Sequence, residues 1–267
     1  MNVLLLFLWK ELRDVRRNPQ LLPAYLILPP IAIFLPVIIT ALAPQIMQVD
    51  PNDPAMKAMA RIVAATPEFQ GYAQDEAITR YFLRNVILLF FIMPIGLSSI
   101  AAAFSIVAEK QQRTLEPILA TPIGDQELLL GKLLAAVVPS VVLTWLSAAI
   151  AIALVDIISY NLYGRLLLPD AFWLIGILGL APLLGICSVL AAMRLSAKST
   201  DPQAANQMTA LVIVPVFMLG IGVFGKVLSL SIAAAFGACA VLALVAVLLF
   251  RWNVRHFHRE EILTRWK

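Results

Sequence analysis

Long apolar runs alternate with short polar segments along the whole chain. Six of these runs are long enough to cross a hydrocarbon layer of roughly 30 Å, and in lipid each must be helical because backbone amides find no other partner there. The predicted spans are 21–43, 86–108, 133–155, 171–193, 208–224 and 227–250. The fifth is the shortest, and the fifth and sixth could together form one hairpin that barely reaches the far surface. The pattern predicts an all-α membrane protein with one transmembrane domain over 1–267.

The first 20 residues have the pattern of an interfacial helix. Apolar residues recur at helical spacing while basic and acidic residues fill the other face, which is typical of a helix lying in the membrane surface. The apolar positions are Leu5, Leu8, Trp9, Leu12 and Val15. Asn18-Pro19 then separates residues 1–20 from the first span. The segment could equally be a membrane anchor with no further role.

The polar segment 44–85, between the first two spans, is the longest connection. It contains turn residues at 50–54 and a possible short surface helix over Met56–Ala65. It could be a simple connector or a cap over an exit path. In the second span that follows, the pairs Ser98/Ala102 and Ser99/Ala103 place small residues four apart. Such pairs allow close helix packing, either within one subunit or between two copies.

Composition and charge place the protein in a membrane and predict its orientation. The chain is 61% hydrophobic and 13% charged, whereas soluble domains carry about 25% charged residues. If both termini are cytoplasmic, 14 of the 20 Lys and Arg residues lie on the cytoplasmic side, as the positive-inside rule favours. We therefore expect a multi-pass protein of the cell (plasma or inner) membrane with a cytoplasmic tail over 251–267. The net charge of +4 then reflects topology and contact with anionic lipid, and predicts no nucleic-acid partner.

Few residues suggest a site for chemistry. Residues 220–226 match the glycine and lysine spacing of a phosphate-binding loop, but Val227 replaces the Ser or Thr that would hold magnesium. The histidines and acids of 256–261 fit no standard metal spacing, and both cysteines fall inside spans. We expect no catalytic residue, no metal site and no bound cofactor in this chain.

The predicted spans contain no Asp, Glu, Lys, Arg or His. Ion-coupled transporters normally place ionisable residues in the membrane, and intramembrane enzymes need convergent acids, bases or metal ligands. An ion-coupled secondary transporter or channel without an ATPase partner remains the alternative function.

The polar segment 109–132 joins the second and third spans and carries the most information. Thr114 can cap a short helix, Glu116 lies in its first turn near the positive helix end, and Pro117 loses no hydrogen bond there. Leu115, Ile118 and Leu119 then share one face. A helix this short is not stable alone, so a docking partner is expected. The alternative is a capped polar loop that contacts only water and lipid.

This segment resembles the signature of ABC-2 type transporter permeases, the membrane subunits of many bacterial and archaeal ABC exporters. The resemblance rests on the run from Arg113 to Pro122, on Glu109 before it, and on Glu127 and Gly131-Lys132 after it. Two departures stand out. Arg113 replaces the usual Gly, and only Gly225-Lys226 separates the last two spans where many relatives insert further helices.

The resemblance implies a half-transporter of the type V exporter kind that has no motor of its own. Two copies would pair, a homodimer being favoured over a heterodimer, and each would bind a separate ATP-binding subunit that carries ATP and Mg. Segment 109–132 would supply the coupling helix. The residues assigned to ATPase contact and coupling are Glu109, Arg113, Thr114, Leu115, Glu116, Pro117, Ile118, Leu119, Thr121, Pro122, Glu127 and Lys132.

Overall fold

The structure is a computed structural model of residues 1–267, and it describes residues 22–48, 54–66, 69–111, 124–196, 207 and 232–255. All regular elements in these ranges are helical. In order they are α2 (Leu22–Gln48), α3 (Pro54–Ala65), α4 (Gln74–Gln111), α6 (Asp125–Tyr163), α7 (Ala171–Ile175), the π-helical segment η2 (Gly176–Leu180), α8 (Ala181–Ser196) and α10 (Ile232–Arg255). The all-helical architecture agrees with the sequence prediction.

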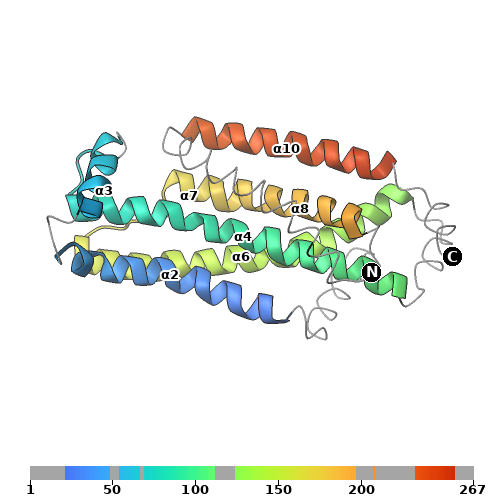
Figure 1. Cartoon of the computed structure of the whole chain (residues 1–267), viewed down its shortest axis with the longest axis horizontal. Helices are drawn as coiled ribbons and strands as arrows, with labels where there is room; N and C mark the ends of the chain where they lie inside the picture. Colours follow the sequence, from blue (N-terminus) through green and yellow to red (C-terminus); the bar gives the residue numbers. More distant parts are fainter. Residues whose placement is uncertain are drawn as a thin grey trace.

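Five helices in the described ranges are long and apolar enough to cross a membrane. They are α2, α4, α6, the continuous unit of α7, η2 and α8, and α10. The predicted fifth span, 208–224, lies outside the described residues, as do the predicted interfacial helix 1–20 and the end of the tail. The end of α8 and the start of α10 lie at opposite ends of the bundle (Figure 1), as six crossings would require. The sixth crossing stays a prediction.

Helices α4 and α6 are much longer than the predicted spans. α4 begins at Gln74, inside the segment expected to be a loop, and α6 runs on to Tyr163. At a rise of about 1.5 Å per residue, each is about 57 Å long, roughly twice the hydrocarbon thickness. Two acids in the first turn of α4, Asp75 and Glu76, favour that start because of the helix dipole, and Gly164 ends α6 in the left-handed conformation (φ 69°).

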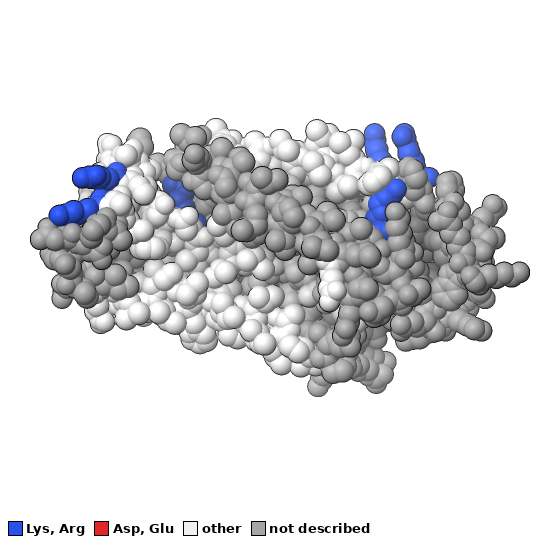
Figure 2. All heavy atoms as spheres, viewed as in Figure 1, with Lys and Arg blue, Asp and Glu red and all other residues white. Residues whose placement is uncertain are grey.

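The long helices lie side by side along the long axis of the molecule, with α4 in the middle (Figure 1). In its most apolar 18-residue window α4 is 67% buried, whereas α2 is 22% and α10 is 11% buried. The outward faces of α2 and α10 carry large apolar side chains such as Phe34 and Leu244. On the face shown in Figure 2, described Lys and Arg side chains lie toward the two ends, and the described surface between them is uncharged. This distribution is that of a bundle surrounded by lipid.

A π-helical turn interrupts the fourth long unit where it crosses α4 and α6. A Cβ on Gly176 would lie 2.6 Å from Ile87 Cδ1 and 3.2 Å from Phe91 Cζ, so a side chain here would displace the ends of both neighbouring side chains of α4. Trp145 of α6 donates its indole N–H to the Ile177 carbonyl at 2.9 Å. A side chain of the neighbouring helix thus satisfies a carbonyl inside the π segment, as irregular helices in lipid require.

The small residues of α4 pack within the subunit. Ser98 Oγ lies 3.0 Å from Ser188 Oγ of α8 and 3.4 Å from the Gly185 carbonyl oxygen, and all three residues are buried. A Cβ on Gly185 would lie 3.3 Å from Pro94 Cβ. Of the two roles considered for the Ser98/Ala102 pair, the structure therefore shows close contact between helices of one chain.

We predict that Gly176→Leu lowers the thermal stability of the purified protein by several degrees. The added side chain overlaps Ile87 and Phe91, and such overpacking costs about 1–3 kcal/mol. The matched control is Gly237→Leu, because a Cβ at this helical glycine meets nothing within 4 Å. Thermal unfolding in mild detergent checks the pair, and equal melting temperatures for the two variants would contradict the close approach at Gly176.

Candidate functional site

The twelve residues predicted to contact an ATPase fall in the sequence segment that begins at the end of α4 and runs into the start of α6. Three of them, Glu109, Glu127 and Lys132, belong to these helices. The other nine lie outside the described residues, namely Arg113, Thr114, Leu115, Glu116, Pro117, Ile118, Leu119, Thr121 and Pro122. The predicted roles of the twelve residues therefore stay predictions. The structure describes the two helices, α4 and α6, that the segment connects.

The start of α6 presents one charged side chain outward and buries another. Gly124 precedes the helix in an extended conformation, and its carbonyl accepts the first helical hydrogen bond from the Leu128 N–H at 3.0 Å. Glu127 is exposed in the first turn, where the positive helix end stabilises a carboxylate. Lys132, one turn further along, is only 9% exposed. The side chains of Glu127 and Lys132 thus lie in different environments.

A hydrophobic cluster below this helix start joins four helices. Its buried residues are Ala101 and Ala102 of α4, Leu129, Leu133, Ala136, Val137 and Val141 of α6, and Val189, Leu190, Ala192 and Met193 of α8, with Leu249, Phe250 and Val254 of α10 packed against them. The start of α6 is therefore packed against α8 and α10 as well as against α4.

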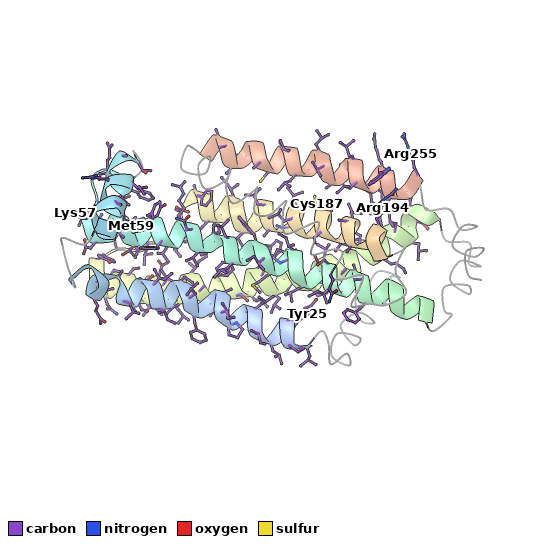
Figure 3. All side chains as sticks on the ribbon, in the orientation of Figure 1. Tyr25, Lys57, Met59, Cys187, Arg194 and Arg255 are labelled. Atoms are coloured by element: carbon purple, nitrogen blue, oxygen red, sulfur yellow. The ribbon has the colours of Figure 1, made fainter. Side chains whose placement is uncertain are left out.

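Polar contacts strengthen the same junction between α8 and α10. Asn253 Nδ2 donates to the Leu190 carbonyl at 3.3 Å and to the Leu249 carbonyl at 2.9 Å. The Arg194 guanidinium lies 3.4 Å from the centre of the Trp252 ring. Figure 3 shows Arg194 and Arg255 together at this end, far from Lys57 and Met59 of α3 at the other. We call these two ends the junction end and the α3 end.

The α3 end is a folded cap rather than a bare connection. Val63 of α3 and Phe69 after it are buried against Ala77 and Ile78 of α4. Tyr81 contacts Phe69 edge-on, with ring centres 6.3 Å apart. Part of the predicted connector 44–85 therefore has its own small hydrophobic core on the extended start of α4.

A buried carboxylate binds this cap to the loop that follows α6. Glu76 is 4% exposed at its side chain, and its Oε1 accepts from Arg80 Nε at 3.1 Å and from Arg80 Nη2 at 3.0 Å. Arg165 Nε lies 3.8 Å from Glu76 Oε2, and Arg80 Nη2 also donates to the Leu166 carbonyl at 3.4 Å. The two arginines thus hold the start of α4 against the 164–170 loop.

A cavity of about 150 Å³ lies beside these charges, between Phe69, Arg80, Arg84, Asp170 and Trp173. No site was predicted here from the sequence, because the segment was expected to be a loop. A signal was nevertheless present. Glu76, Arg80 and Arg84 follow one another at intervals of four, which places them on one face if the segment is helical.

Helices of membrane-spanning length, lipid-type outer faces and charges at both ends define an integral membrane protein of the helical-bundle class. The sequence model of the ABC-2 family transporter proteins matches residues 5–233. The chain therefore belongs to the ABC-2 transporter family, which confirms the resemblance seen in segment 109–132, and it is a permease, the membrane subunit of an ABC transporter. Proteins of this family normally work with an ATP-binding subunit and are generally not catalytic themselves. No curated protein and no solved structure gave a match.

We predict that Glu76→Gln destabilises the protein by about 1–3 kcal/mol, because it leaves Arg80 and Arg165 without their shared anionic partner. Glu127→Gln is the matched control, since the same change is made at an exposed position at the other end. The check is thermal unfolding of both variants in the same detergent. A Glu76→Gln protein as stable as the control would show that the ion pairs contribute nothing to the cap.

Proposed function

We propose that this chain is the permease subunit of an exporter, and that ATP hydrolysis in a separate subunit drives substrate across the membrane. The ATPase docks on the cytoplasmic segment 109–132, and two copies of the permease form the translocation path between them. The family match carries this proposal, together with the position of the polar segment between two helices that run through the whole bundle.

The geometry of α4 and α6 supports a mechanical role for the segment. Each is an unbroken helix from the junction end to the α3 end, and together they flank the residues assigned to ATPase contact. A push on the segment therefore tilts two rods of about 57 Å, and the cluster at their base carries α8 and α10 along. ATP-driven closure of the partner subunits would rock the two permeases and open a path along their interface.

The weakly buried outer helices support pairing of two copies. Apolar faces of α2 and α10 are exposed in the single chain, and either lipid or a second permease can cover them. The predicted spans contain no ionisable residue, so they offer no carboxylate for ion coupling. ATP hydrolysis in a partner supplies the missing energy source in this proposal.

The proposed orientation places the junction end in the cytoplasm. In a background with Cys187 and Cys239 replaced by alanine, we expect Glu127→Cys to react with a membrane-impermeant maleimide only when the cytoplasmic face is accessible. Arg61→Cys, exposed on α3, should react from the outer face of intact cells. Leu129→Cys, buried one turn from the edge, is the control for accessibility. Labelling of both exposed positions from the same side would refute the proposed topology.

The partner is tested by purifying the tagged chain in mild detergent from its native host and identifying co-eluting proteins by mass spectrometry. We expect a soluble ATP-binding subunit in near-stoichiometric amount. An intact, folded permease that elutes with no ATP-binding subunit would favour an autonomous channel over the proposed exporter.

Coupling is tested by Glu116→Lys, which reverses a charge in the proposed docking helix. We expect transport and permease-stimulated ATPase activity to fall about tenfold or more, because the reversed charge disrupts the charge complementarity of the docking helix to its partner. Lys57→Glu is the control, since it reverses an exposed charge on α3 at the opposite end. Unchanged transport and ATPase activity in Glu116→Lys would remove the segment from the mechanism.

A further inference from the structure

The cavity at the α3 end contains a buried donor that lacks an acceptor. Trp173 is 1% exposed and lines the cavity, and its indole Nε1 has no hydrogen-bond partner among the described residues. The indole nitrogen can only donate, and a buried donor left unsatisfied costs about 1–3 kcal/mol. Trp145, by contrast, has its indole N–H paired with a carbonyl. The described part of the chain therefore provides no acceptor for the indole N–H of Trp173.

Two guanidinium groups line the same cavity. Arg80 binds Glu76 and Leu166 through Nε and Nη2, so Nη1 makes no hydrogen bond to a described residue. The Arg84 guanidinium lies over the Phe172 ring, 4.6 Å from its centre. Arginine presents a fixed fork of donors that matches phosphate and carboxylate oxygens. The groups that line the cavity thus favour an anionic acceptor.

The nearby carboxylates are already engaged by their own neighbours. Asp170 Oδ1 accepts the backbone N–H of Trp173 at 2.7 Å and caps α7. Both oxygens of Glu76 face arginines, Oε1 toward Arg80 and Oε2 toward Arg165. A cationic ligand would meet the guanidinium groups of Arg80 and Arg84 in the wall, whereas an oxyanion would meet donors. These contacts therefore favour an anionic ligand over a cationic one.

The position of the cavity along the bundle further limits which anions could reach it. Arg80 and Arg84 directly precede the apolar stretch of α4, and Trp173 lies in the first turn of α7, where the fourth long unit begins. Aromatic and arginine side chains at the end of a hydrophobic span lie at the level of the lipid headgroups. One water needs about 10–15 Å³ of such space, so 150 Å³ has room for a group with several oxygens.

We propose that this cavity binds one phosphate or phosphodiester group, with Trp173 Nε1 and the guanidinium groups of Arg80 and Arg84 as donors. The group belongs either to the headgroup of an anionic phospholipid or to a free phosphate. Binding here joins the cap to the start of the fourth long unit, and it does not depend on how the permease is coupled to its ATPase.

The test uses the full chain, delipidated in a neutral detergent and free of phosphate buffer. Inorganic phosphate, phosphatidylglycerol and diacylglycerol are titrated separately, and the melting temperature is followed, since a ligand that binds the folded state raises it saturably. We expect phosphatidylglycerol or inorganic phosphate to raise the melting temperature and diacylglycerol to leave it unchanged. A shift with phosphatidylglycerol alone assigns the site to a lipid headgroup, and a shift with inorganic phosphate shows that the free anion suffices.

Two pairs of variants test the assigned donors. Trp173→Phe keeps an aromatic side chain but removes the indole N–H together with the five-membered ring, and Arg80→Gln removes the charge. Each should weaken binding about tenfold or more, as expected for a hydrogen bond to a charged group. Trp252→Phe at the junction end and Arg61→Gln on α3 are the matched controls and should bind as the unmodified chain does.

The melting temperatures without ligand show whether each variant is folded, and native mass spectrometry counts bound phospholipid independently. The proposal is overturned if neither phosphate source gives a saturable shift, because the cavity then holds water only. It is also overturned if diacylglycerol acts like phosphatidylglycerol, or if the donor variants bind as tightly as their controls.

Discussion

Hydrocarbon cannot hydrogen-bond a peptide group, and the rest of this structure depends on that constraint. Every described segment of membrane-spanning length is helical, and where the helical pattern is irregular a neighbour supplies the missing bond. Trp145 does so for Ile177. Apolar character alone cannot hold such helices together in lipid, so the bundle relies on small residues and short polar contacts such as Ser98 with Ser188.

The described charged side chains lie toward the two ends of the bundle, and the described surface between them is uncharged (Figure 2). At the junction end, a shared hydrophobic cluster packs α4, α6, α8 and α10 against one another. At the α3 end, ion pairs and a small core hold the connector between α2 and α4 as a cap. The helices α4 and α6 connect the two ends, because each spans the whole distance between them.

The sequence was sufficient to predict the helical membrane class, because long apolar runs must be helical in lipid. It was also sufficient to predict the family, because the segment from Arg113 to Pro122 is specific to it. It was insufficient for the length of α4. Residues 74–85 carry charges that resemble a loop when read singly, and their helical register becomes visible only when Glu76, Arg80 and Arg84 are considered together. The cavity was missed for a further reason, since it combines α4 with Asp170 and Trp173, which are distant in sequence. Of the predicted coupling residues, only Glu109, Glu127 and Lys132 fall in described helices.

The π-helical turn has a consequence for how the fourth long unit faces its neighbours. Within it the Ala181 N–H bonds to the Gly176 carbonyl, five residues back, so one extra residue is accommodated without breaking the helix. Gly176 and Ala181 are therefore both buried, and the periodicity of buried positions restarts from Ala181 to Gly185 and Ser188. Each residue of an ordinary helix turns it by about 100°. Loss of a single residue from this segment would leave an unbroken helix that is apolar enough to insert, yet one of its halves would face the wrong neighbour.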